Sequence, residues 1–160
     1  MKRVVSDTSI LIYGSKTGCL TTFSGLFEVL IVVPEVVREL GDHSEEVALL
    51  RRLPNARFPE EDTATHPALL ACNGMHAGEL AVLSFALDFG IDTVLVDDSA
   101  ARACAKRVDL RIAGFLGVLQ AAKMEGLLPA VRPLADAAIA AGYRIRPSVY
   151  AAFLRRIGEA

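Results

Sequence analysis

Short apolar runs alternate with longer stretches of helical period along this chain. The runs are rich in β-branched residues and apolar at nearly every position, as strands buried on both faces of a sheet are. Strands are expected at residues 4–5, 29–33, 93–96 and 110–112. Helices are expected at residues 10–26, 34–40, 44–53, 79–89, 99–108 and 116–125, with two more after residue 129. This alternation predicts right-handed crossovers and a mainly parallel sheet covered by helices on both faces.

Glycine and proline positions help to set the boundaries of these elements. Pro34 suits the first turn of a helix, and Gly90 and Gly126 follow helical stretches as C′ residues do. Residues 54–73 show the weakest periodicity and are expected to form an irregular loop. At 160 residues the chain is expected to be one domain, residues 1–160, with a core at about 1–128 and C-terminal helices at about 129–160.

Composition excludes several classes of protein. Hydrophobic residues make up 52% and charged residues 22%, which is incompatible with a disordered chain. No apolar run reaches the roughly 18 residues of a membrane span, and the start MKRVVSDTS has too short an apolar stretch for a signal peptide. We therefore expect a cytoplasmic protein without membrane contact. Cys19, Cys72 and Cys104 are odd in number and lack metal-ligand spacing, which predicts reduced, buried thiols.

The net charge of −2 limits how the chain could bind nucleic acid. A protein that binds through a broad basic surface is usually clearly positive. Contact with nucleic acid must then depend on a local patch, on metal ions that face phosphates, or on a partner chain. Basic pairs at residues 51–52, 106–107 and 155–156 are candidates for such a patch, although pairs of this kind are usually solvated helix faces.

Four separated carboxylates carry the clearest chemical signal: Asp7, Glu39, Glu79 and Asp97. Asp7 and Asp97 each end an expected strand, and ligands bind beyond the carboxyl ends of parallel strands. Neighbouring like charges oppose one another's ionisation, so a fold that gathers carboxylates usually does so to hold a hard divalent cation. Asp98 directly follows Asp97, and only one of these two carboxylates is needed to cap the next helix.

Each of these carboxylates also has a structural explanation. Asp7 resembles an N-cap, a role compatible with metal binding, and Glu79 in a first helical turn gains stability from the helix dipole. Glu35 and Glu39 lie four residues apart on one helix face. Glu35 has the same dipole explanation as Glu79, whereas Glu39 lies near a helix C-terminus, where negative charge is unfavourable. We prefer Glu39 as the site residue, and Glu35 remains the alternative.

The ordered motifs resemble those of PIN-domain proteins. The likeness covers about residues 4–128 and includes VVSDTSILI, VVPEVVREL, HAGELAVLSFAL and VDDSAARACAKRVDLRIAGFLGVLQAAKMEGLL. DDSAAR followed by GFLGVLQAAK is the most specific part and resembles the VapC-type branch in particular. The resemblance implies an α/β fold, a PIN-like three-layer α/β/α sandwich with a mainly parallel central sheet.

The same resemblance implies a function. It implies a divalent-metal-dependent endoribonuclease that cleaves single-stranded RNA with Mg²⁺ or Mn²⁺, often the toxin component of a toxin–antitoxin pair. The partners would be an RNA substrate and an antitoxin protein, and we expect a homodimer. Carried over by position, the catalytic carboxylates would be Asp7, Glu39, Glu79 and Asp97, and the metal ligands would come from Asp7, Glu79, Asp97 and Asp98. Ser9 would support a ligand carboxylate, and Arg102 would neutralise the carboxylates or hold RNA backbone.

Two other classes of protein remain open. A catalytically inactive PIN-fold module could bind RNA or protein, and divalent-metal binding that depends on Asp7 and Asp97 would separate it from a nuclease. A receiver-like phosphoacceptor domain needs two acids after its first strand, whereas Asp7 is followed by Thr8 and Ser9. It also needs a lysine after its last strand, where this chain has Ala113 and a glycine.

Overall fold

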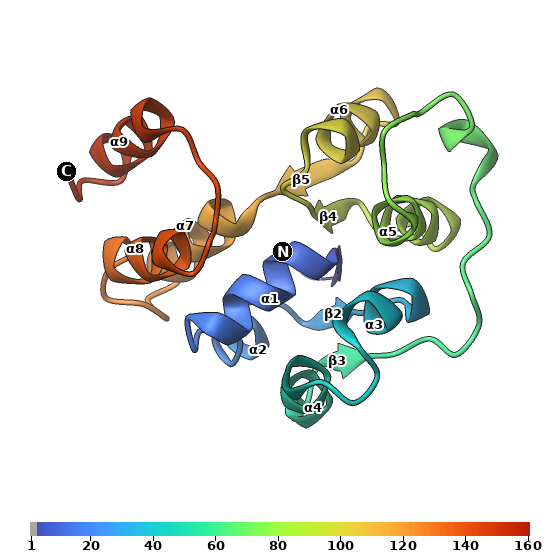
Figure 1. Cartoon of the computed structure of the whole chain (residues 1–160), viewed down its shortest axis with the longest axis horizontal. Coiled ribbons are helices and arrows are strands. Elements are labelled where there is room, and N and C mark those ends of the chain that lie inside the picture. Colours follow the sequence, from blue (N-terminus) through green and yellow to red (C-terminus); the bar gives the residue numbers. More distant parts are fainter. Residues whose placement is uncertain (1–2) are drawn as a thin grey trace.

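A five-stranded sheet forms the centre of the molecule (Figure 1). The computed structural model describes residues 3–160; residues 1 and 2, which open the expected domain and the start examined for a signal peptide, lie outside the described residues. The strands are β1 (Arg3–Ser6), β2 (Val29–Ile31), β3 (Ala56–Arg57), β4 (Thr93–Leu95) and β5 (Arg111–Ala113). They are all parallel in the order β3-β2-β1-β4-β5. The parallel α/β architecture is confirmed.

The two strands that matter most for the site are neighbours at the centre of this sheet. Val5 of β1 pairs with Ile31 of β2 on one side and with Val94 of β4 on the other. Val5 and Val94 are completely buried, because helices cover both faces of the sheet at this point. β5 is an edge strand, and its Arg111 side chain is exposed. The carboxyl ends of β1 and β4 therefore lie next to each other.

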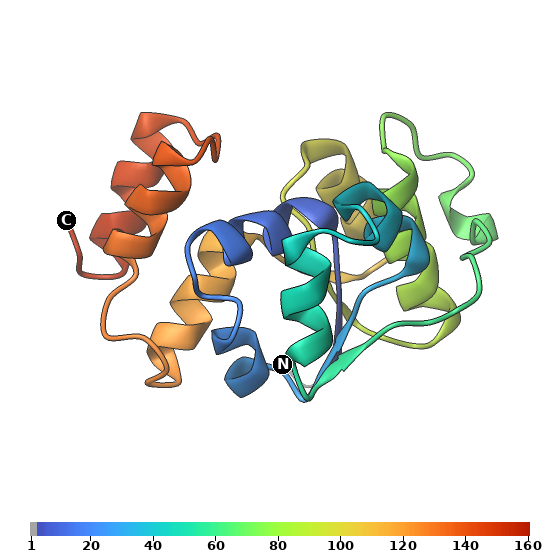
Figure 2. The same ribbon diagram turned by 60° about the horizontal axis from the view of Figure 1, so that its bottom comes forward.

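Helices occupy both sides of the sheet. They are α1 (Thr8–Lys16), α2 (Thr22–Leu26), α3 (Pro34–Leu40), α4 (Glu45–Arg52), α5 (Ala77–Asp88), α6 (Ser99–Arg107), α7 (Phe115–Met124), α8 (Arg132–Ala140) and α9 (Pro147–Arg156). Figure 1 shows α1 and α7 on one side of the sheet and α5 and α6 on the other, while in Figure 2 the pair α8 and α9 lies beyond α7 at one end of the molecule. Across residues 3–160, none of the helices combines the length and the apolar character needed to traverse a bilayer.

Two predictions of secondary structure were wrong. The single helix expected at residues 10–26 is two helices, because the chain turns at Gly18, whose φ of +70° favours glycine. The segment expected to be irregular, residues 54–73, contains β3 and a short 3₁₀ helix, Pro67–Leu69. A two-residue edge strand is too short to produce a detectable alternation, so β3 could not be seen in the pattern.

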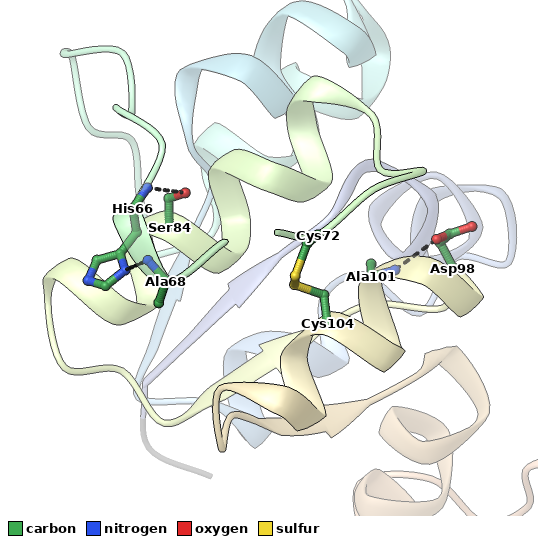
Figure 3. Close-up of a disulfide and its surroundings, with 7 residues drawn as sticks. All are labelled: His66, Ala68, Cys72, Ser84, Asp98, Ala101 and Cys104. Atoms are coloured by element: carbon green, nitrogen blue, oxygen red, sulfur yellow. Dashed lines mark hydrogen bonds between the residues drawn. A yellow bond between two sulfur atoms is a disulfide. The ribbon is translucent and has the colours of Figure 1, made fainter. Parts of the chain in front are cut away.

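A disulfide joins the loop that precedes α5 to the middle of α6 (Figure 3). Its partners are Cys72 and Cys104, whose Cα atoms lie 5.9 Å apart, within the usual range for a disulfide. The prediction of three reduced thiols is therefore wrong for these two residues, and only Cys19 remains a buried free thiol in the described chain. The sequence could not reveal the pair, because the cysteines are 32 positions apart and the segment between them gives no sign that the loop returns to α6. Cysteine usage thus no longer supports the expected cytoplasmic location.

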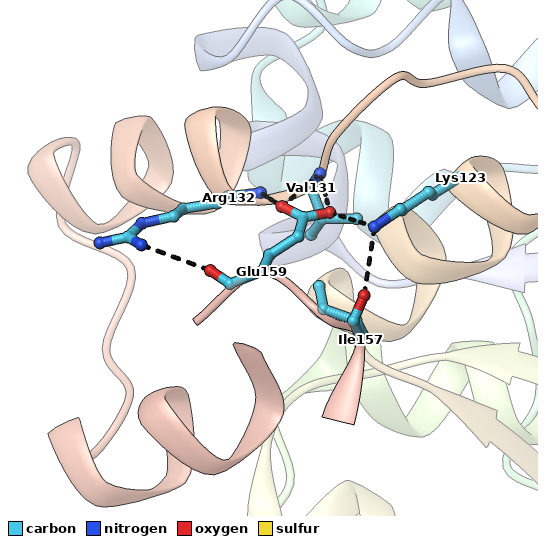
Figure 4. Close-up of polar contacts among 5 residues, drawn as sticks. All are labelled: Lys123, Val131, Arg132, Ile157 and Glu159. Atoms are coloured by element: carbon cyan, nitrogen blue, oxygen red, sulfur yellow. Dashed lines mark hydrogen bonds and ion pairs between the residues drawn. The ribbon is translucent and has the colours of Figure 1, made fainter. Parts of the chain in front are cut away.

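The end of the chain is fastened to α7 and α8 by Glu159 (Figure 4). Its carboxylate accepts hydrogen bonds from the backbone N–H groups of Val131 and Arg132, at 2.9 and 2.6 Å, and pairs with Lys123 Nζ at 2.6 Å. Burial alone would raise the pKa of Glu159, but the hydrogen bonds from Lys123, Val131 and Arg132 outweigh it and lower the pKa to about 2. This contact holds the end of α9 against the start of α8.

Candidate active site

Asp7 lies at the carboxyl end of β1 and is almost completely buried, with 3% of its surface exposed. Its backbone N–H donates to Leu95 O of β4 at 2.9 Å, so the neighbouring strand fixes its position. Its carboxylate caps α1 by accepting from Ile10 N at 3.1 Å, and Ser9 Oγ donates to the same group at 3.1 Å. The capping and the site interpretations of Asp7 are thus compatible, and Ser9 is in hydrogen-bond contact with this carboxylate.

Asp97 follows β4 and faces the start of α7. Its Oδ2 accepts from Phe115 N at 3.0 Å, and its Oδ1 accepts from the Tyr143 hydroxyl at 3.3 Å. A Cβ at Gly114 would overlap Asp97 Oδ1, so the side chain reaches this place only because residue 114 is glycine. Burial raises the pKa of Asp97, and the charge of Arg102 is one of the influences that oppose this rise, which favours the neutralising role for that arginine.

Glu39 lies at the N-termini of two other helices. It accepts a short hydrogen bond from the Thr8 hydroxyl, in the first turn of α1, and another from Gly78 N of α5 at 2.9 Å. These helix starts supply the positive partial charge that the C-terminus of its own helix lacks. Glu35 is elsewhere: it accepts from Thr63 N at 2.8 Å and thereby holds the loop after β3. The structure places Glu39, and not Glu35, beside the residue that follows Asp7.

Glu79 and Asp98 both take part in helix caps. Glu79 Oε2 accepts from His76 N at 2.9 Å at the start of α5. Asp98 Oδ1 accepts from Ala100 N and Ala101 N at 2.8 and 2.9 Å and caps α6. The structural explanation therefore accounts for the position of Asp98, while Glu79 lies one residue from the glycine that binds Glu39.

The carboxylates act on one another electrostatically. Burial, and then the charges of Asp97 and Glu79, raise the pKa of Asp7 to about 7. Burial also raises the pKa of Asp97. For Glu79 burial is again the largest cause of a raised pKa, and the charges of Asp98 and Glu39 add to it. A cation among these groups would remove much of this repulsion.

The donor set fits a hard divalent ion, although no group of three or more His, Cys, Asp or Glu residues in the described chain is arranged as a ready metal site. Each carboxylate has at least one oxygen that accepts a hydrogen bond from a nearby backbone N–H group. The atoms that could ligate the ion are all carboxylate oxygens, as Mg²⁺ and Mn²⁺ prefer, and such ions retain several waters. The residues that would hold the ion are Asp7, Asp97 and Glu79.

Comparison with known families decides the classification. Residues 3–159 match the PIN domain. The chain belongs to the PIN-domain family. PIN domains are generally nucleases that typically use divalent metal ions, which agrees with the positions of Asp7 and Asp97 at the carboxyl ends of β1 and β4. A search of curated proteins found no match.

Sequence reasoning missed four residues that shape this site: Thr8, Gly78, Gly114 and Tyr143. Both glycines stand where a side chain would strike a carboxylate, and a Cβ at Gly78 would come within 2.6 Å of Glu39 Oε2. Their place directly before Glu79 and Phe115, inside the quoted motifs, was a signal that could have revealed them. Tyr143 gave no signal, because it follows Asp97 by 46 residues in a segment without a recognised motif.

Proposed function

We propose that this PIN domain is a divalent-metal-dependent endoribonuclease that cleaves single-stranded RNA. The observation that carries the proposal is the pair Asp7 and Asp97, held on neighbouring strands with pKa values raised by burial. Such a pair is unfavourable without a cation, and groups with perturbed pKa values gather at functional sites. Mg²⁺ or Mn²⁺ is the proposed cofactor.

The residues of the site divide into two roles. Asp7, Asp97 and Glu79 would hold the ion, which when bound stabilises charge on the phosphate and supplies an activated water. Ser9, Phe115 N and the Tyr143 hydroxyl fix the orientation of the two aspartates. Glu39 acts by positioning, because its hydrogen bonds tie the start of α1 to the start of α5 and so align Asp7 with Glu79.

We also propose that the protein is the toxin component of a toxin–antitoxin pair. Support comes from the resemblance of DDSAAR and GFLGVLQAAK to the VapC-type branch. A cognate antitoxin would then be the protein partner, a homodimer the proposed assembly and the cytoplasm the proposed location. Growth arrest on expression of the wild-type chain, absent for Asp97→Asn and relieved by co-expression of the gene beside it, tests this assignment.

Cleavage of a fluorescent single-stranded RNA in Mn²⁺ tests the enzymatic proposal. We expect EDTA to abolish cleavage, and Asp7→Asn, Glu79→Gln and Asp97→Asn to abolish it singly, because ligands of one site act as a unit. Glu39→Ala should also be strongly damaging, whereas Glu35→Ala on the same helix should have a mild effect. Cleavage that survives both EDTA and Asp97→Asn would come from a contaminating nuclease and would contradict the proposal.

A non-catalytic binding module is the second candidate. It is favoured by the local hydrogen bonds that engage each carboxylate and by the absence of a ready metal cluster among residues 3–160. Calorimetric titration with Mn²⁺ separates the two candidates, since the nuclease requires binding that Asp97→Asn weakens. Equal binding by wild type and variant would favour the module.

A further inference from the structure

A cleft of about 1070 Å³ opens beside the candidate active site. Asp97 and Tyr143 line it, together with α6, β5, the start of α7 and the segment that leads from Tyr143 into α9. In Figure 1, α7 runs from β5 toward one end of the molecule, and this segment and α9 lie at that end. The cleft therefore connects the carboxylates to a wall built by the C-terminal part of the chain.

The side chains that line this cleft are strongly basic. Its cations are Arg102, Lys106, Arg111, Arg144, Arg146 and Arg156, and its one carboxylate is Asp97. This concentration contrasts with the net charge of −2 for the whole chain. Of the six cations, only Arg111 forms an ion pair within residues 3–160, with the exposed Asp92 at 3.7 Å. The cleft thus offers several cations that have no anionic partner within the described chain.

These features favour a polyanionic strand over an acidic protein segment. Asp97 by itself would repel the carboxylate of an acidic peptide and a phosphodiester alike, but a phosphodiester held there by the proposed divalent ion is the bond that the proposed nuclease would cleave. The aromatic residues that line the cleft offer little exposed ring surface for base stacking, because Tyr143 is partly buried and Phe153 has 8% of its surface exposed. Recognition would then depend on phosphates more than on bases, as in sequence-tolerant binding of single strands.

We infer that single-stranded RNA reaches the carboxylates through this cleft, with its phosphates bound by the cations of α6 and of the segment from Arg144 to α9. The inference rests on the proposed function for the identity of the strand. It assigns the segment from Tyr143 and α9 the task of forming one wall of the substrate path, with Glu159 fastening the end of α9 to α7 and α8.

The chain provides a matched control for this inference. Lys106 and Arg156 line the cleft, and the adjacent Arg107 and Arg155 do not, although all four lie on the same two helices and are exposed. The test compares Lys106→Gln/Arg156→Gln with Arg107→Gln/Arg155→Gln. Binding of a fluorescein-labelled oligouridylate is followed by anisotropy in EDTA, so that cleavage plays no part, and thermal melting verifies that both variants are folded.

We expect the cleft variant to bind roughly 10- to 25-fold more weakly at about 0.1 M salt, and its slope of log K against log salt to fall by about 1.4, at about 0.7 per phosphate contact on a single strand. The control should change affinity by less than about 2-fold. Arg144→Gln/Arg146→Gln, on the connecting segment, should behave like the cleft variant. If the cleft and control variants weaken binding equally, or if wild type does not bind the RNA, the inference is overturned.

Two further outcomes separate the inference from the proposed function. If the cleft variant alone loses binding but wild type never cleaves RNA in Mn²⁺, the path is correct and the nuclease proposal fails. If polyglutamate displaces the oligouridylate at equal or lower charge concentration, the cleft binds acidic protein segments and the inference is overturned.

Discussion

Replacing Asp7 by asparagine should stabilise the metal-free protein at pH 8 and leave its stability at pH 4 nearly unchanged. Asparagine retains a side-chain oxygen that can accept from Ile10 N, so the cap of α1 survives. What changes is the charge. In the folded wild type the pKa of Asp7 is about 7, against 3.8 for the ordinary group. The folded chain therefore holds a proton that the unfolded chain releases between these two pH values.

The sign and size of the effect follow from this difference. Below pH 3.8 the group is protonated in both states and does not affect stability. As pH rises toward about 7 the unfolded state loses its proton first, so the free energy of unfolding falls. Above about 7 the loss is complete and amounts to about 4 kcal/mol, at about 1.4 kcal/mol per pKa unit. In a chain of this size that corresponds to a melting temperature lower by on the order of 10 °C.

Thermal melting in EDTA from pH 4 to pH 8 measures this effect. Wild type should lose stability across the range, and Asp7→Asn should lose much less. Asp42→Asn, at an exposed position, is the control and should follow wild type. Mn²⁺ should restore stability to wild type at pH 8 and have little effect on Asp7→Asn. A variant that melts below wild type at pH 8 would show that Asp7 is a structural cap, and the electrostatic reasoning would be refuted.

Three further outcomes are expected. Cys72→Ser/Cys104→Ser should lower the free energy of unfolding by about 3–4 kcal/mol, as chain entropy predicts for a loop of this length. The comparison is made without thiol reductants, so that wild type keeps its disulfide, and equal denaturant midpoints would contradict the prediction. Gly78→Ala should reduce RNA cleavage strongly because its methyl group strikes a carboxylate, while Gly117→Ala, with its nearest contact at 3.9 Å, should be tolerated. Glu159→Gln should lower the melting temperature at pH 7, and the difference from wild type should vanish as the pH falls toward about 2, because the lowered pKa stabilises the fold only while the carboxylate is charged.

The parallel sheet was predictable because its central strands are buried on both faces and read as continuous apolar runs. β1 and β4 could be predicted from the sequence for this reason, and so could the position of the aspartates that follow them at one edge of the sheet. Glu39 could be preferred over Glu35 by its unfavourable place on its own helix. The structure explains the position of Glu39, because its carboxylate accepts hydrogen bonds at the N-termini of α1 and α5.

What the sequence could not provide are contacts made across long separations. The bond from Tyr143 to Asp97, the disulfide between Cys72 and Cys104, and the basic cleft each join segments that carry no local sign of meeting. The even scatter of charge along the chain concealed the cleft, since its cations come from several elements that only the fold brings together. Periodicity reports on local burial, and these features depend on topology.

The spread of the site along the chain has a consequence for the cell that makes the protein. Asp7 emerges from the ribosome before Asp97, and Tyr143 follows Asp97 by a further 46 residues. At about 5–20 residues per second, roughly 7–27 s separate the first of these from the last. Throughout that interval the nascent chain lacks the hydroxyl that orients Asp97 and the wall that completes the cleft. For the proposed ribonuclease, a chain still being translated would thus hold its carboxylates without the means to align them, and the messenger and ribosome nearest to it would be spared.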